Sequence, residues 1–303
     1  MNLFIVYTTL FIIAFFVGII GNTIGIGGGI MLVPFFIFYM HLSPLESSGL
    51  SLFTIMISTM GGSYIFYKDK TIDLNLYLMI LLPAVLGIIT GSVLSRYIPV
   101  NQFKWLFSFG IIGIGIFSFA ATKKQTATSA KGGNNYKLKR NNEQNTAKET
   151  STRLFFNGLF SRHIRKTLVE SNGTTYDYEI KSPLLIDIFS LIAGFISGFM
   201  GIGIGGITGT FLIAVEQIPP RIAFSTIISV MAIISLIGGL IHFYYIKNPL
   251  YMAVYIIPLG AGALVGSKAG AFISKKSRAK TLRVYQATFI VLLGILMLLI
   301  SAL

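Results

Sequence analysis

Long runs of residues without charge constrain this sequence more than any other feature. The first forty residues contain no Lys, Arg, Asp or Glu, and only 11% of the whole chain is charged, against roughly 25% in a soluble domain. A helix that spans a bilayer needs about 20 mostly apolar residues. Eight segments meet this requirement: 4–40, 47–67, 74–95, 105–122, 188–215, 222–246, 250–267 and 284–303.

The apolar segments are expected to be helical, because lipid offers no partner to an unpaired backbone N–H or C=O group. We therefore predict an all-α polytopic membrane protein whose main partner is the lipid bilayer. With no cysteine in the chain, disulfides and thiolate metal sites are excluded. The three histidines lack the spacing of metal ligands, so we expect neither a metal nor a cofactor.

The distribution of charge argues against a nucleic-acid partner, although the net charge is +14. Residues 122–182 carry 12 basic and 5 acidic side chains and lie outside every apolar segment. Basic loops tend to stay on the cytoplasmic side of a membrane, and this composition cannot bury a core. We predict a basic, largely disordered cytoplasmic loop at 122–183, within which Asn172 and Gly173 hint at a small hairpin.

Two related halves flank this loop. Residues 18–35 read GIIGNTIGIGGGIMLVPF, and residues 194–211 read GFISGFMGIGIGGITGTF. In each half a turn containing proline, a helix rich in hydroxyls and a third apolar segment follow in the same order. Internal repeats of this kind indicate duplicated structural units, so we predict a first transmembrane repeat at 1–121 and a second at 184–303.

Both glycine clusters, at 25–29 and 201–206, are expected to interrupt a helix, because each glycine costs a helix roughly 1 kcal/mol relative to alanine. A second basic cluster at 275–283 should face the cytoplasm together with the central loop. Only three apolar segments lie between the two basic regions, and three complete crossings would place these regions on opposite sides of the membrane. One segment must therefore return to the side on which it starts, and the interrupted segment 184–215 is the candidate. By the same reasoning residues 4–40 form a re-entrant hairpin. Each half then has a hairpin and three crossings, the repeats are inverted, and both termini lie outside.

A short helix should begin at each break, near Ile30 and near Ile207. The start of a helix carries free N–H groups and about half a positive charge, which together suit an anion. Convergence of the two breaks would therefore create an anion site. The glycines expected to line it are Gly25, Gly27, Gly28, Gly29, Gly201, Gly203, Gly205 and Gly206.

Polar side chains near the breaks and near the following helix starts are candidate hydrogen-bond donors to the anion. They are Asn22, Thr23, Ser48, Ser51, Ser225, Thr226 and Ser229. Hydroxyls at helical spacing also serve simple packing between membrane helices, and both readings stay open here.

Enzymes of the bilayer usually carry clusters of His, Asp or Glu at the ends of their spans, and this sequence has none. We therefore expect no catalytic residues and no enzymatic activity. We also predict that none of Glu46, Asp187 and Glu216 carries a coupled proton. A secondary transporter of small anions fits these features best, with an anion channel or a membrane-embedded enzyme as the alternatives.

The motifs GIGGGIMLVP at 25–34 and GIGIGG at 201–206 resemble the paired signatures of the TauE/SafE family, also called TSUP. The resemblance covers nearly the whole chain except the central loop. It implies a membrane transporter that exports or imports sulfite, sulfonates or related sulfur oxyanions. Ile204 stands where the first motif has Gly28, and Thr210 where it has Pro34, so the halves are expected to contribute unequally. The oligomeric state, the direction of transport and the coupling ion stay open.

Overall fold

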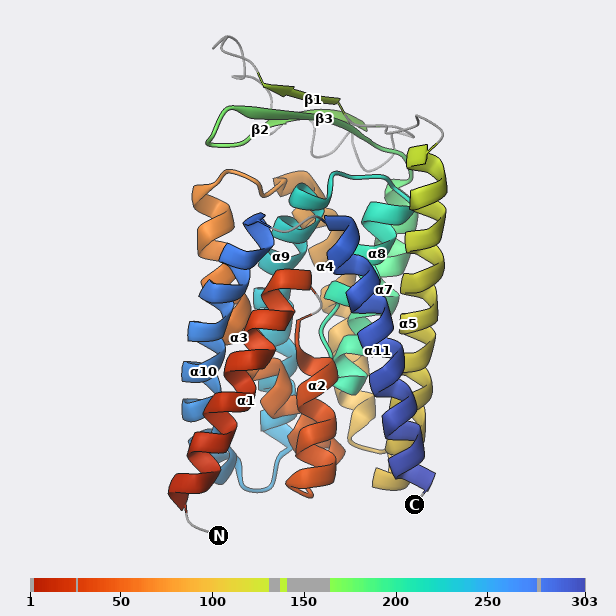
Figure 1. Cartoon of the computed structure of the whole chain (residues 1–303). Coiled ribbons are helices and arrows are strands. Elements are labelled where there is room, and N and C mark those ends of the chain that lie inside the picture. Colours follow the sequence, from red (N-terminus) through yellow and green to blue (C-terminus); the bar gives the residue numbers. More distant parts are fainter. Residues whose placement is uncertain (1–2, 26, 131–136, 141–163, 277–278, 303) are drawn as a thin grey trace.

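The computed structural model describes residues 3–25, 27–130, 137–140, 164–276 and 279–302 as a bundle of helices capped by a small sheet (Figure 1). Within this part of the chain, seven helices are long and apolar enough to cross a membrane. The prediction of an all-α polytopic membrane protein is confirmed. The helical elements are α1 Leu3–Ile24, α2 Gly29–Pro34, the π-helical turn η1 Phe35–Tyr39, α3 Pro44–Lys68, α4 Leu74–Ser95, α5 Val100–Ala130, α7 Pro183–Met200, α8 Gly205–Ala214, α9 Pro220–Tyr245, α10 Pro249–Lys276 and α11 Ala279–Ala302.

The two interrupted segments enter the bundle from opposite ends (Figure 1). Helix α1 rises from the end that holds both termini, and α2 with η1 returns to that end. Helix α7 starts at the end that carries the sheet, and α8 returns there, so both segments are re-entrant hairpins. The path of the chain in the two halves is thus opposed, while a two-fold relation between the repeats stays a prediction.

Each hairpin packs against a helix of the other half. A Cβ atom at Gly262 or Gly266 of α10 would stand 2.2 or 2.1 Å from a carbonyl oxygen of α1. A Cβ atom at Gly87 or Gly91 of α4 would stand 2.2 or 2.1 Å from a carbonyl oxygen of α7. Small residues let the helix backbones approach this closely. The halves 1–121 and 184–303 are therefore interlocked around shared buried side chains.

A three-stranded antiparallel sheet covers one end of the bundle, where the sequence predicts a largely disordered loop. Its strands are β1 Lys137–Arg140, β2 Ile164–Val169 and β3 Thr174–Ile180, in the order β1-β3-β2. The hint of a hairpin at Asn172 and Gly173 was correct, since Gly173 turns the chain with a φ of 82° between β2 and β3. Residues 131–136 and 141–163 of the predicted loop lie outside the described residues.

Asp73 fastens the sheet to the bundle. Its carboxylate caps the start of α4 by accepting from two backbone N–H groups. The same carboxylate accepts from Lys166 Nζ of β2 at 2.5 Å and from the hydroxyl of Tyr178 of β3 at 2.5 Å. Because Asp73 is only 5% exposed, it needs these partners to offset the loss of water. The strands are ordered by this contact with the helices, which their own composition does not reveal.

Arg221, at the start of α9, makes a second contact with the sheet. Its guanidinium pairs with Asp69 at 2.7 Å and with Glu170 at 3.1 Å. A basic side chain at this position could either attract an anion or set the topology. With two carboxylates bound, this cation is already neutralised, so it offers little attraction to a passing anion.

A pH titration of stability tests the Asp73 contact. Burial and the neighbouring Asp73 carboxylate raise the pKa of the Tyr178 phenol well above its usual value of 10.0. Below pH 10 the phenol is protonated in the folded and the unfolded chain. Above it the unfolded chain ionises first, so the free energy of unfolding falls as the pH rises. Tyr178→Phe removes this contribution, and its unfolding temperature should fall less steeply between about pH 9 and about pH 11.

Tyr67→Phe is the matched control, because Tyr67 is 75% exposed and should keep the wild-type slope. Thermal unfolding of the three purified proteins in detergent supplies the comparison. Equal slopes for all three would show that Tyr178 does not hold its proton in this way.

Candidate functional site

Both glycine clusters break their helices, as predicted. Gly25, Gly27 and Gly28 have φ angles of 75°, 92° and 75°, and Gly201 and Gly203 have 73° and 79°. These angles lie in the left-handed region, which costs a residue with a side chain roughly 1–2 kcal/mol. Glycine is therefore required for the backbone at these positions, and not only for close packing.

The two breaks contact each other directly in the interior of the bundle. A Cβ atom at Gly29 would stand 2.4 Å from the carbonyl oxygen of Gly201. A Cβ atom at Gly205 would stand 2.0 Å from the carbonyl oxygen of Gly25. The first residue of each short helix is thus pressed against the backbone of the opposite break, and no side chain fits between them.

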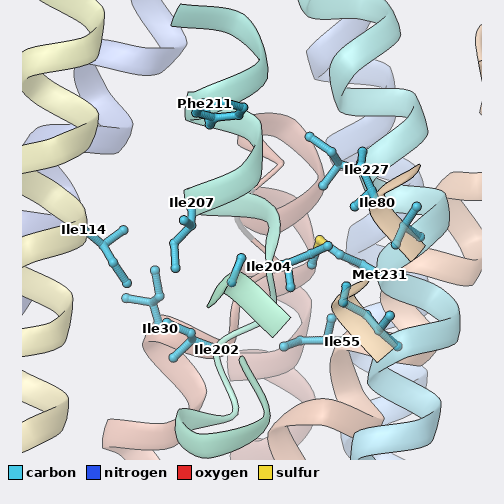
Figure 2. Close-up of a cluster of buried hydrophobic side chains, with 14 of the residues drawn as sticks. Ile30, Ile55, Ile80, Ile114, Ile202, Ile204, Ile207, Phe211, Ile227 and Met231 are labelled. Atoms are coloured by element: carbon cyan, nitrogen blue, oxygen red, sulfur yellow. The ribbon is translucent and has the colours of Figure 1, made fainter. Parts of the chain in front are cut away.

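Apolar side chains surround this contact (Figure 2). Ile202 and Ile204 belong to the second break, and Ile30, Ile55 and Met231 lie close by in the same buried cluster. The methyl carbon of Met231 would be 2.2 Å from a Cβ atom at Gly27. Water is therefore excluded, and electrostatic interactions at the breaks are stronger than they would be in solvent.

The short helices start at the breaks with no side chain to cap them. Gly28 precedes α2 and Ile204 precedes α8, and neither makes a side-chain cap hydrogen bond. The first N–H groups of a helix have no partner within it, so two sets of donors and two partial positive charges meet here. The starts, at Gly29 and Gly205, lie within two residues of the predicted ones.

Two predicted hydroxyls on α3 reach the second break. Ser51 Oγ donates to the carbonyl oxygen of Gly201 at 2.6 Å. Ser48 Oγ would be 3.0 Å from a Cβ atom added at Gly201. This hydroxyl has no hydrogen-bond partner. Both side chains are 0% exposed. Ser48 thus holds a free donor beside the break.

Asn22 and Thr23, which immediately precede the first break, have other partners. Asn22 Nδ2 donates to Ser58 Oγ at 2.7 Å, which joins α1 to α3. Thr23 Oγ1 donates to the carbonyl oxygen of Gly270 at 3.1 Å, which joins α1 to α10. Both side chains hold the first hairpin in place without donating to a break.

Ser225, Thr226 and Ser229 are not brought to the breaks either. Ser225 Oγ donates to the carbonyl oxygen of Thr71, and Thr226 Oγ1 accepts from Asp73 N. Ser229 Oγ donates to the carbonyl oxygen of Ser225 in its own helix. The first two tie α9 to the α3–α4 connection beside the sheet.

The reason for this difference is helical register. Ser48 stands four residues after Pro44, the first residue of α3, and the residue four after Pro220 in α9 is Phe224. Ser225 follows Phe224 and is therefore rotated by about 100° around the helix. Phe224 faces Gly25, and one of its ring carbons would be 2.6 Å from a Cβ atom added at Gly25. Counting from the two prolines would have identified Phe224 and Met231, which the hydroxyl pattern missed.

Two of the carboxylates considered for proton coupling hold backbone groups. Glu46 completes a capping box with Ser43 at the start of α3. Glu216 is 1% exposed and accepts from the backbone N–H groups of Lys181 and Ser182. Neither carboxylate is among the nearest neighbours of the break glycines 25, 27, 28, 29, 201 and 205. The absence of a coupled proton stays a prediction.

This arrangement defines a polytopic membrane protein in which two glycine-broken hairpins meet at the centre of a helical bundle. Residues 10–297 match the family model described as sulfite exporter TauE/SafE, and the chain belongs to this family. The resemblance of the glycine motifs is thereby confirmed, and the protein is a membrane transporter of that family.

Two relatives carry the name probable membrane transporter protein. YunE of Bacillus subtilis (strain 168) is 23% identical over 295 residues, which cover 95% of this chain and 96% of YunE. MJ0441 of Methanocaldococcus jannaschii is 26% identical over 303 residues, which cover 96% of this chain and 94% of MJ0441. No solved structure matches the chain.

A single added methyl group tests the contact between the breaks. Gly205→Ala places a Cβ atom 2.0 Å from the backbone oxygen of Gly25, so the hairpins must separate and the variant should lose about 3 kcal/mol of stability. Gly113→Ala is the control, because a Cβ atom there meets nothing within 4 Å, and its stability should stay within about 1 kcal/mol of the wild type. Thermal unfolding in detergent measures both. Equal stability of the two variants would contradict the contact.

Proposed function

We propose that the protein is a secondary transporter of small anions, with sulfite, sulfonates and related sulfur oxyanions as substrates, bound where the two glycine breaks meet. The observation that carries the proposal is the meeting of two uncapped helix N-termini, those of α2 and α8, in a buried apolar environment. The family to which the chain belongs supports the choice of substrate class.

Electrostatics gives this geometry a preference for negative charge. Each helix start contributes about half a positive charge, and two such charges of the same sign repel each other. An anion bound beside both starts offsets the repulsion and supplies acceptors for the free N–H groups. The interaction is strong because the surrounding isoleucines and Met231 exclude water.

The lack of a charged side chain at the breaks favours release as well as binding. For the described glycines at 25, 27, 28, 29, 201 and 205, the nearest neighbours are backbone atoms or side chains of Val, Ile, Phe, Met and Ser. A lysine or arginine there would hold an anion with a full charge. Partial charges from backbone groups hold it more weakly, which suits a carrier that must free its cargo in each cycle.

Movement of the hairpins would expose the site to either side in turn. The α1–α2 hairpin enters from the end with the termini, and the α7–α8 hairpin enters from the end with the sheet (Figure 1). Carriers built on broken helices alternate access by rocking one bundle against another around a fixed site. The flexible side chain of Met231, which lies over Gly27 and close to Gly205, is the easiest wall to displace.

We also propose that the sheet end faces the cytoplasm and that both termini lie outside. The sheet, whose strands belong to the basic segment 122–182, lies at the same end of the bundle as the end of α10 and the start of α11, where the basic cluster 275–283 falls in the sequence (Figure 1). Both carry an excess of Lys and Arg, which favours the cytoplasmic side.

Flux into proteoliposomes tests the proposal. Vesicles preloaded with unlabelled sulfite should take up radiolabelled sulfite at a rate that saturates, and uptake should exceed that of unloaded vesicles, because a carrier exchanges one bound anion for another. Sulfate, thiosulfate and methanesulfonate as competitors would rank the substrates. Liposomes without the protein are the control.

Measurements of flux and of current with the same proteoliposomes separate the alternatives. A current that rises linearly with voltage and shows no counterflow would indicate an anion channel on this scaffold. No flux of any anion in the panel would contradict the transport of sulfur oxyanions and leave the enzyme alternative in place.

A further inference from the structure

The two breaks share left-handed backbone angles at two matched positions, Gly25 with Gly201 and Gly27 with Gly203, but they have different walls. On α3, the side chain facing the opposite break is Ser48, which lies against Gly201. On α9, the side chain in the matching place is Phe224, which lies against Gly25. The next residue on the same face, seven after each proline, is Ser51 on α3 and Ile227 on α9. The second break thus faces hydroxyls, and the first faces hydrocarbon.

Unpartnered hydroxyls gather at the second break in the same way. Among the described residues, seven buried side-chain atoms have no hydrogen-bond partner, and three belong to Ser48, Ser197 and Thr208. Ser197 stands four residues before Gly201 at the end of α7. Thr208 is the fourth residue of α8. All three side chains are 0% exposed.

The matching positions at the first break have no hydroxyl. Gly21 stands four residues before Gly25, and Leu32 is the fourth residue of α2. Asn22 has an unpartnered oxygen, but this oxygen is an acceptor, and an acceptor repels an anion. Donors for an anion are therefore concentrated on one side of the contact between the breaks.

We infer that the second break supplies the side-chain donors of the anion site, with Ser48, Ser197 and Thr208 as hydroxyl donors beside the N-terminus of α8, and that the first break supplies an apolar wall built by Phe224 and Met231. This inference rests on the proposed function and assigns its specificity-determining residues.

The cost of burying these hydroxyls supports the assignment. A buried hydroxyl without a partner costs roughly as much as a lost hydrogen bond. Ser48 lies against Gly201, and Ser197 and Thr208 lie about one helical turn from the ends of the second break along α7 and α8. Ser51 adds to the preference, since its hydrogen bond occupies the carbonyl oxygen of Gly201, which would otherwise repel an anion. The donors are arranged to face the substrate, and these hydroxyls gain hydrogen-bond partners only when an acceptor enters the site.

Ser48→Ala tests the inference, with Ser190→Ala as the matched control. Both serines are 0% exposed and lack a partner. Ser190, however, precedes Gly201 by eleven residues on α7, or roughly 16 Å along the helix. Neither substitution removes a hydrogen bond of the protein, so both variants should unfold at the wild-type temperature or slightly above it. Dissociation constants for sulfite, sulfate and methanesulfonate come from anion-dependent shifts in the unfolding temperature.

The expected result is a loss of affinity of about 10-fold or more in Ser48→Ala, because hydrogen bonds to charged groups are the stronger ones, with wild-type affinity in Ser190→Ala. Equal affinities in the wild type and both variants would overturn the inference and leave the proposed function standing. Failure of every anion to bind the wild type would overturn the proposed function as well. If Ser48→Ala does not fold, Thr208→Val, which keeps the shape and removes the hydroxyl, decides the question: unchanged affinity overturns the inference.

Discussion

The close contact between the two glycine breaks is the constraint on which the rest of the structure depends. Gly29 and Gly205 begin their helices directly against the backbone of the opposite break. This contact brings two helix N-termini together in the dry interior, a costly arrangement because the first N–H groups have no partner in their own helix. Backbone strain and unmet polar groups of this kind persist only where the surrounding structure holds them.

The interlocked packing of the halves provides that hold. Helix α1 packs closely against α10, and α7 against α4, through glycines that place backbone against backbone. Hydrogen bonds from Asn22 to Ser58 and from Thr23 to Gly270 reinforce the first hairpin. At the end that carries the sheet, Asp73 pairs with Lys166 of β2, and Arg221 pairs with Asp69 and Glu170. The hairpins are thus held by these contacts, while the starts of α2 and α8 keep unpaired donors for a ligand.

Much of the fold could be predicted because its signals are local. Segment 74–95 was predicted to the residue as α4, since a span in lipid must be apolar and must satisfy its own backbone. The capping box of Ser43 and Glu46 needs only four consecutive residues. The breaks were predictable because five of their glycines adopt backbone angles that other residues rarely adopt. The sheet was mostly missed, since Lys166 and Tyr178 find their partner Asp73 about one hundred residues away.

By itself, the sequence determined that the chain lies in a membrane and that each of two similar glycine motifs breaks a helix. Hydrophobicity and glycine conformation act within a few residues, and a repeated motif needs no fold to be visible. Only the tertiary structure decided which hydroxyls reach the breaks: Ser48 and Ser51 do, whereas Ser225 and Thr226 bind the α3–α4 connection. The physical reason is that one residue of register turns a side chain by about 100° around its helix, and the packing of α3 and α9 against the opposite hairpins sets that register.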